Sequence, residues 1–364
     1  MAKFRKIKKV LKSRPTIEGA GVHLKRAFGN QHVPMLDPFL LLDDFHSDNP
    51  AYYLKGFPWH PHRGIETITY VLHGKVEHGD SMGNEGTIQP GDVQWMTAGS
   101  GIIHQEVPKG EKDGLMWGFQ LWANLPASHK MMDPRYQEIK SRQIPEVSLD
   151  GGVQIKIICG EVNGVKGPVQ NIVINPEYLD VTVPPGKNFS HQIGKGKTAF
   201  AYVIAGKGYF DRERDSYAHE VEGANYFDFK RECLFGPENL ILFGDGDEVA
   251  ISPQDEPVRF LLVSGKPIQE PVAWYGPIVM NTQEELRVAF EEYERGTFVK
   301  HKMKYGFIEG GSCKTRGIKE ESSFWASGTR PGIQIFKRFL LSVRYGLGGV
   351  FEMRHGTYGW RPDY

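Results

Sequence analysis

The 364-residue sequence has few cysteines, no long apolar run and no excess of either charge. Its three cysteines, Cys159, Cys233 and Cys313, are far apart and odd in number, which argues against a disulfide framework and favours a reducing compartment. No stretch of about 18 apolar residues occurs that could span a membrane. The 44 basic and 44 acidic residues balance, so no overall field attracts nucleic acid or an anionic membrane. We therefore expect a cytoplasmic protein, or a nuclear one in a eukaryote, that binds neither membranes nor, directly, nucleic acid.

Basic residues are concentrated in residues 1–14, where seven lysines and arginines occur with no acidic residue. Such a run could be a nuclear-import signal or a nucleic-acid-binding arm. Apolar residues, among them Phe4, Ile7 and Val10, are interleaved with the charges. This pattern is typical of a strand with one solvated face, and we favour the strand.

Residues 5–259 consist of short apolar or alternating runs, broken by glycine, proline, asparagine and aspartate about every ten residues. Runs such as 67–72 and 199–204 are rich in β-branched and aromatic residues, as strands are. The stretches 72–76 (LHGKV) and 204–208 (IAGKG) also have similar sequences, which indicates a duplication. The sequence therefore predicts an all-β protein built from two consecutive antiparallel β-barrels.

Two features suggest how the chain is divided. Asp133-Pro134 and Ile144-Pro145 interrupt the pattern and mark a linker between the barrels, while Thr282 and Glu285 have the spacing of a capping box that begins a short helix. The predicted segments are an N-terminal metal-binding barrel over 1–132, a linker over 133–150, a second barrel without metal over 151–280, a helical segment over 281–310 that packs back on the barrels, and an atypical, disordered tail over 311–364. We expect the protein to be a monomer.

Two short motifs carry ligand-type side chains. In a strand, the imidazoles of His60 and His62 point to the same face, and so do the side chains of His104 and Glu106. If two adjacent strands bring both pairs together, three nitrogens and one carboxylate oxygen meet. That set suits iron, manganese, nickel or copper and leaves coordination positions open, whereas the lack of thiolates argues against a closed structural zinc site.

A second carboxylate competes with Glu106. Glu66 lies six residues after His60, so on an unbroken strand it faces the same way as both His60 and His62. Strand parity alone does not choose between Glu66 and Glu106 as the fourth ligand.

The motifs also carry a family resemblance. The stretches 60–67 (HPHRGIET) and 90–106 (PGDVQWMTAGSGIIHQE) resemble the two signature sequences of the pirin family, and 36–45 and 276–282 resemble further pirin segments. The similarity covers roughly residues 3–304. It implies two consecutive cupin barrels of the jelly-roll type, whereas the tail departs from the family and inherits no role from it.

The resemblance also implies a ligand set and two possible functions. Iron(II) would be held by His60, His62, His104 and Glu106, with Glu66 outside the coordination sphere, and manganese, nickel or copper remain alternatives. One implied function is a flavonol (quercetin) 2,4-dioxygenase that opens the ring with O2 and releases CO, in which Glu106 or Glu66 takes the proton of the 3-hydroxyl. The other is an iron-dependent redox sensor that binds a transcription factor or a metabolic enzyme without turnover.

The remaining candidates have weaker patterns. A set of apolar side chains near the motifs could line the approach to the metal or form core: Phe57, Trp59, Trp95, Met96 and Trp117. The isolated histidines are expected to be solvated or hydrogen-bonded rather than ligating: His73, His78, His129, His191 and His219.

Overall fold

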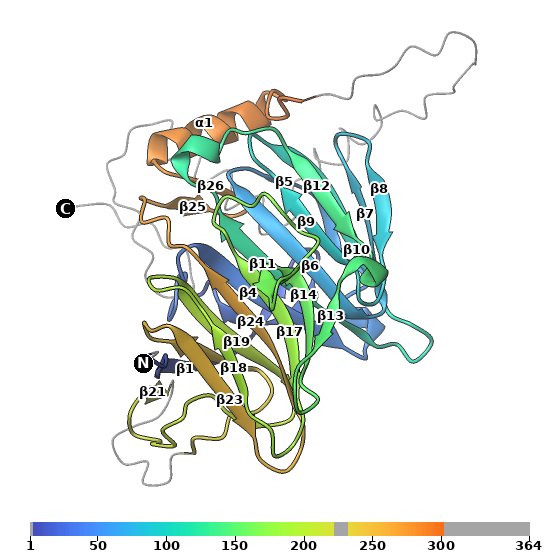
Figure 1. The fold of residues 1–364 in the computed structure, drawn as a ribbon. Helices are drawn as coiled ribbons and strands as arrows, with labels where there is room; N and C mark the ends of the chain where they lie inside the picture. Colours follow the sequence, from blue (N-terminus) through green and yellow to red (C-terminus); the bar gives the residue numbers. More distant parts are fainter. Residues whose placement is uncertain (1–2, 222–231, 302–364) are drawn as a thin grey trace, which may run out of the picture. The chain divides into compact units, whose positions relative to one another are not determined.

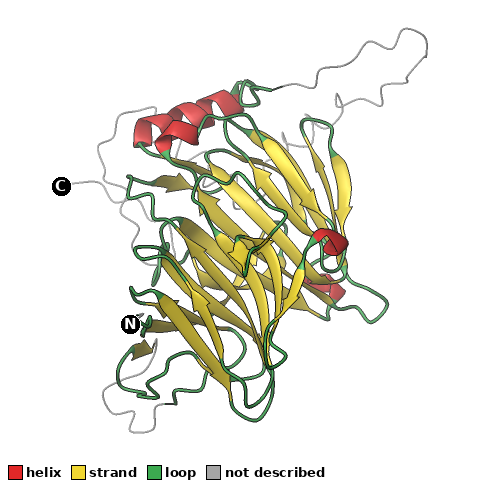
Figure 2. Cartoon of the chain, in the orientation of Figure 1, coloured by secondary structure: helices red, strands yellow, loops and turns green. Residues whose placement is uncertain are grey.

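The computed structural model of the chain describes residues 3–221 and 232–301. Strands dominate these ranges, with one α-helix near their end, so the prediction of an all-β protein with a short C-terminal helix is confirmed (Figure 2). Within the described ranges, no helix has the length and apolar character needed to cross a membrane. The tail over 311–364 lies outside the described residues, and its predicted disorder stays a prediction.

The first half consists of two antiparallel sheets. In spatial order the larger sheet contains β12 (Arg135–Ile139), β9 (Val93–Thr97), β6 (Ile65–His73), β11 (Met116–Asn124), β4 (Phe39–Ser47), β3 (Val22–Phe28) and β2 (Arg14–Glu18). The smaller sheet contains β5 (Phe57–His62), β10 (Ile102–Lys109), β7 (Lys75–Asp80) and β8 (Glu85–Ile88). Hydrogen bonds between side chains of β6 and β10 and of β7 and β9 join the two sheets face to face.

The second half repeats this arrangement. Its larger sheet contains β13 (Glu146–Ser148), β14 (Gln154–Cys159), β17 (Glu177–Val183), β24 (Val258–Gly265), β19 (Thr198–Ala205), β22 (Asn239–Phe243), β1 (Ile7–Lys12) and β21 (Glu220–Val221). Its smaller sheet contains β18 (Phe189–Gln192), β23 (Glu248–Pro253) and β20 (Gly208–Tyr209). Short elements complete the described chain: β15 (Glu161–Val162), β16 (Val165–Lys166), β25 (Ala273–Tyr275), β26 (Ile278–Met280), three 3₁₀ turns (Pro50–Tyr52, Ala127–His129, Ser141–Gln143) and α1 (Gln283–Glu294).

The basic N-terminal segment forms a strand, as expected, but it joins the second half rather than the predicted domain 1–132. β1 pairs with β22 and β21, and Figure 1 shows it, in dark blue, beside the yellow-green strands. Ile7 and Val10 enter the apolar core there. Lys6 and Lys9 form ion pairs with Glu213 and Glu220, which neutralises part of the charge that a nucleic-acid arm would need.

The predicted linker 133–150 contains paired strands. β12 lies at the edge of the first large sheet beside β9, and β13 lies at the edge of the second beside β14. After β12 the chain therefore passes from the first half to the second between Ile139 and Glu146.

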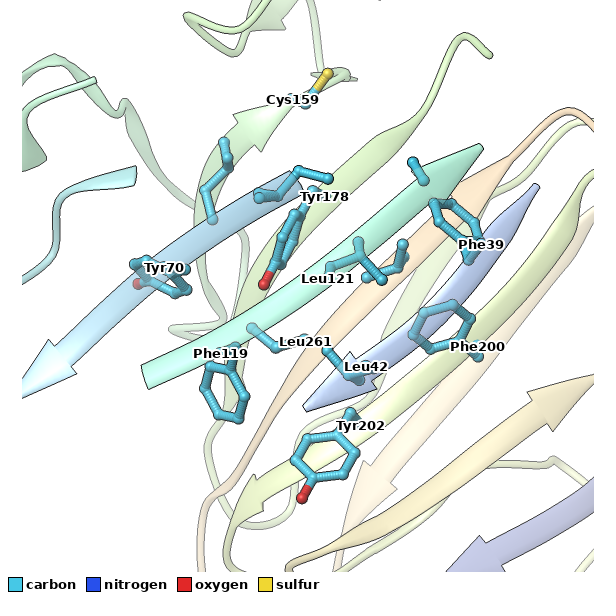
Figure 3. Close-up of a cluster of buried hydrophobic side chains, with 14 of the residues drawn as sticks. Phe39, Leu42, Tyr70, Phe119, Leu121, Cys159, Tyr178, Phe200, Tyr202 and Leu261 are labelled. Carbon is cyan, nitrogen blue, oxygen red and sulfur yellow. The ribbon is translucent and has the colours of Figure 1, made fainter. Parts of the chain in front are cut away.

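The two large sheets pack face to face across a shared apolar core. Figure 3 shows side chains of both sheets in this core, among them Phe39 and Phe119 from the first half and Phe200 and Leu261 from the second. β6 is buried over its first seven residues because one face meets this core and the other faces the interior of the first half. Tyr70 of β6 donates a hydrogen bond of 2.8 Å to Asp180 across the interface.

The C-terminal segment packs against the first half. The hairpin β25–β26 and α1, drawn in orange in Figure 1, lie beside β5, and Arg63 forms a bridge with Ile278 and an ion pair of 2.8 Å with Glu292. The capping box predicted for the helix is confirmed, since Glu285 N donates to Thr282 and the Glu285 carboxylate accepts from Thr282 N.

Candidate metal centre

β5 and β10 lie side by side in the small sheet of the first half. In their antiparallel register His104 pairs with His60, which places His60, His62 and His104 on the same face. The ligand nitrogens of these three histidines lie within 4.8 Å of one another. The structure thus brings together side chains that lie 44 residues apart in the sequence (from 60 to 104).

Backbone carbonyls orient two of the rings. His60 Nδ1 lies 2.8 Å from the Pro58 oxygen, and His62 Nδ1 lies 3.0 Å from the Pro277 oxygen. A carbonyl oxygen only accepts hydrogen bonds, so each Nδ1 carries the hydrogen and each Nε2 of a neutral ring has a free lone pair. The two Nε2 atoms are 3.0 Å apart. Two lone pairs facing each other at this distance repel, and a shared cation would turn that repulsion into coordination.

The third histidine has no partner in the described structure. Both ring nitrogens of His104 are buried there without a hydrogen bond, which is unusual for buried polar atoms. Burial lowers the pKa of His60 to about 4, and burial with the neighbouring histidines lowers the pKa of His62 and His104 well below its usual value. All three rings are therefore neutral at pH 7, which is the form that binds metal. Three neutral imidazoles at this spacing suit a divalent transition metal.

Glu106 lies on the same side of β10 but slightly apart from the histidines. A β-bulge between His104 and Glu106 shifts the register, so that Glu106 pairs with Phe57. Its carboxylate lies outside the group of ligand atoms within 4.8 Å, and it accepts a hydrogen bond of 3.3 Å from the Thr69 hydroxyl. Burial raises the pKa of Glu106 to about 7. Its role as fourth ligand stays a prediction.

Glu66 does not lie near the histidines, because residues 60–66 do not form the single unbroken strand that the prediction assumed. Gly64 has φ +76° at the turn between β5 and β6, and a Cβ there would lie 1.9 Å from the Val279 oxygen. After this turn Glu66 shares its face with Ile68 and Tyr70, which belong to the core between the halves. The Thr97 hydroxyl donates a 2.6 Å hydrogen bond to Glu66. Glu66 is fully buried on the far side of β6 from Thr69 and Glu106.

Most of the apolar side chains considered for the approach lie elsewhere. Trp95 and Trp117 pack in or against the core between the halves, and Phe57 packs against a separate apolar cluster of the first half. Trp59 alternates with His60 on β5 and so points to the opposite face. Met96 does lie near the centre, in the cluster that also contacts Trp122.

The sequence reasoning missed aromatic residues that lie closer. The Trp122 ring is 4.9 Å from the His62 ring at an angle of 86°, and Trp274 of β25 is 6.3 Å from Trp122. Tyr136 packs against the same apolar cluster. Trp122 and Gln120 lie two residues apart on β11 and therefore face the same way, toward Thr69 and the interior. The sequence alone does not show which face of β11 lines the interior, so it could not identify Trp122.

His78 was expected to be an isolated histidine, but it lies beside Glu106. It pairs with Glu106 across β7 and β10, and its side chain is 2% exposed. Its Nε2 lies 2.9 Å from the Gln94 amide and 3.2 Å from the Glu138 carboxylate. It is hydrogen-bonded, as predicted, but inside the first half next to the candidate centre. In the second half His191 lies 3.1 Å from Glu177.

Buried polar contacts attach the C-terminal segment to the turn that follows His62. The Lys130 ammonium donates to the carbonyl oxygens of Gly64 and Val279 and to the side chain of Asn124. Burial lowers the pKa of Lys130 to about 8. These contacts hold the segment around Val279, two residues after the Pro277 carbonyl that orients His62, close to the turn at Gly64.

Comparison with known proteins agrees with this architecture. Residues 21–123 match the Pirin family model, and residues 178–299 match the model of the Pirin C-terminal cupin domain. A pirin-like protein of Caulobacter vibrioides is 43% identical over 81% of this chain and 99% of its own length. Human pirin is 40% identical over 80% of this chain and 93% of its own length.

A solved structure shares the fold. The crystal structure of a quercetin 2,3-dioxygenase from Acinetobacter baumannii superimposes with a TM-score of 0.70 at 29% identity, covering 81% of this chain and 98% of that one. The two predicted cupin domains are thereby confirmed. With both domain models matched in order, and relatives at this identity aligned along nearly their whole length, the chain belongs to the pirin family.

Proposed function

We propose that this protein is a metal-dependent flavonol dioxygenase with iron(II) as its native metal. The observation that supports it best is the group of three neutral histidines, of which His62 and His104 are buried and His60 and His62 direct their Nε2 lone pairs at each other from 3.0 Å. His60, His62 and His104 would hold the ion, and Glu106 would complete the set. A bound divalent metal supplies an acidic site for a substrate oxygen and open positions for O2.

Glu106 would handle the proton. As a carboxylate it could accept the proton of a flavonol 3-hydroxyl and later return it. The Thr69 hydroxyl lies 3.3 Å from one carboxylate oxygen and helps to hold the side chain in place. Glu66, the other predicted acid–base candidate, lies on the far side of β6 and does not enter this proposal.

The surroundings suit a flat, apolar substrate. Leu40, Ile65, Met96 and Ile102 form a buried apolar cluster on the side of the interior that Trp122 shares with His62. Such a lining excludes water, and exclusion of water strengthens the electrostatic interactions of the few polar groups left inside. The relative from Acinetobacter baumannii carries the name of a quercetin dioxygenase, which supports the same substrate class.

The test uses the full chain loaded with iron(II). Loss of the flavonol absorbance of quercetin is followed under air and under nitrogen, and CO is measured in the gas phase. We expect loss with CO release under air only. Metal binding with no oxygen-dependent loss for iron, manganese, nickel or copper would contradict the proposal and favour the alternative of a redox-sensing regulator that binds a protein partner.

A further inference from the structure

The hairpin β25–β26 supplies the carbonyl that orients His62, yet it belongs to neither of the large sheets. Its two strands form a separate two-stranded sheet. The turn between them carries Pro277, whose oxygen lies 3.0 Å from His62 Nδ1. A two-stranded hairpin is only marginally stable by itself in water. The position of the Pro277 oxygen therefore depends on the contacts that fix this hairpin to the first half.

Lys130 makes the most deeply buried polar contact between the hairpin and the rest of the first half. Its side chain is buried, with 1% of the residue exposed, and its ammonium donates to three oxygen atoms. These are the Gly64 oxygen at 3.0 Å, the Asn124 side-chain oxygen at 2.7 Å and the Val279 oxygen at 3.0 Å. All three N–H bonds of the ammonium are thereby used. Asn124 ends β11, Gly64 lies two residues after His62, and Val279 belongs to the hairpin, so one ammonium joins three segments around His62.

Two of the three acceptors lie where the backbone of the hairpin comes very close to the turn at Gly64. A Cβ on Gly64 would lie 1.9 Å from the Val279 oxygen. The oxygens of Gly64 and Val279 accept from the same ammonium, so the negative ends of two carbonyl dipoles converge on one buried point. Two such dipoles repel each other unless a positive group lies between them. Loss of the ammonium should therefore let the hairpin move away from the turn.

Packing alone does not explain a lysine at this place. The three acceptors of Lys130 are neutral, and among the residues that the structure describes its ammonium forms no ion pair with a carboxylate. Burial lowers the pKa of Lys130 to about 8. A methionine of similar length would fill the same space without the free-energy cost of burying a charge. The three directed hydrogen bonds therefore account for the lysine better than its volume does.

We propose that Lys130 is a positioning residue of the metal centre, which joins the hairpin to the turn after His62 and so holds the Pro277 oxygen against His62 Nδ1. The hydrogen bond to that oxygen keeps Nε2 of the same ring directed at the ion. The ring of His60 is oriented instead by the oxygen of Pro58, two residues before it in the chain. Lys130 therefore acts on one of these two histidines and not on the other. The inference rests on the proposed metal centre but not on its catalytic use.

Metal affinity is measured by titrating the full chain with zinc in competition with a chelator. Lys130→Met should weaken zinc binding about tenfold to a hundredfold, the usual effect of removing a contact that orients a metal-binding histidine. Arg5→Met is the matched control, because Arg5 is also 1% exposed and also donates to three carbonyl oxygens, but in the second half. Both variants should have a lower melting temperature than the wild type, while the zinc affinity of Arg5→Met should equal that of the wild type.

A second readout follows the two histidines separately. The Nδ1–H groups of His60 and His62 in the zinc-loaded protein are observed by proton–nitrogen NMR and are assigned with His60→Asn and His62→Asn. In Lys130→Met the His62 proton should shift and exchange faster with water, because its acceptor is no longer held in place. The His60 proton should behave as in the wild type. A general loss of structure would change both protons alike.

The outcomes separate this inference from the proposed function. Unchanged zinc affinity in Lys130→Met, equal weakening by Arg5→Met, or equal changes at His60 and His62 would each overturn the inference. Weakened zinc binding in Lys130→Met alone, together with no quercetin turnover by the iron form of the wild type, would support the inference and count against the dioxygenase. Lys130→Gln, which keeps an amide donor, replaces Lys130→Met if that variant does not fold, and the same contrast between His60 and His62 is expected.

Discussion

The two halves of the protein share one architecture and use its interior differently. In each half a large sheet faces a small one, and the large sheets pack on each other. The small sheet of the first half carries His60, His62 and His104 on its inner face. At the corresponding place in the second half, Phe189 packs with Phe260 at 6.0 Å within a continuous apolar core.

The difference shows that a ligand centre replaces stabilising apolar contacts in the half that contains it. A filled apolar interior stabilises the second half, as about 25 cal/mol is gained per Å² of apolar surface buried. The first half keeps a belt of buried polar groups instead, including Thr69, His78, Gln94 and Glu106. Their hydrogen bonds to one another offset part of the cost of burying them. We expect the second half to contribute mainly stability.

The largest expected effect is the loss of the metal centre. His104→Ala should abolish metal binding and quercetin turnover, since it removes one of the three histidine ligands, while the fold is retained because His104 has no hydrogen bond to lose in the described structure. Metal content is measured by atomic spectroscopy on protein purified without added metal. His191→Ala in the second half is the control and should keep the metal. Retention of the metal in His104→Ala would contradict the ligand assignment.

The second largest expected effect is a loss of stability in the second half. Phe260→Ala removes a fully buried ring that contacts Phe189 and Phe210, and should lower the free energy of unfolding by about 3–5 kcal/mol. Urea titration followed by circular dichroism measures this loss. Metal content of the protein that remains folded should equal that of the wild type. Loss of metal from the protein that remains folded would show that the second half is also needed for metal binding.

A third prediction compares the two carboxylates. Glu106→Gln should lower kcat/KM for quercetin by about a hundredfold or more, because the amide cannot take up the proton. Glu66→Gln should change metal content and turnover by less than about twofold, since Glu66 faces the core between the halves and bonds to Thr97, and a local change there leaves the centre in place. Steady-state kinetics and metal analysis of both variants decide the matter. Equal losses in the two would place Glu66 in the mechanism.

The sequence was sufficient for the features that depend on local spacing. The pairs His60/His62 and His104/Glu106 could be assigned to common faces because strands alternate with period two, and the cap at Thr282 followed from helix geometry. These rules need no knowledge of distant parts of the chain.

The remaining features depend on contacts between distant segments. Parity failed for Glu66 because Gly64 breaks the strand where Val279 approaches. The orientation of His62 depends on Pro277, more than 200 residues away in sequence. Trp122 was missed for a related reason, since the sequence of a strand buried on both faces does not show which face lines the interior.

The smallest expected effect concerns the contact between the halves. Asp44 of β4 accepts hydrogen bonds from Tyr202 of the second half at 2.8 Å and from Trp117 at 3.1 Å, and burial raises its pKa from 3.8 to about 7. A carboxyl with a raised pKa in the folded state contributes stability below its unfolded pKa, near 4, and that contribution is lost as the pH rises toward 7. Between pH 4 and 7.5 the wild type should therefore lose stability relative to Asp44→Asn, whose amide can accept from Trp117 and donate to Tyr202 without titrating. Urea unfolding of both proteins across this range measures the difference, in which the titration of all other groups cancels. Parallel pH curves would show that the charge of Asp44 does not weaken the attachment of one half to the other.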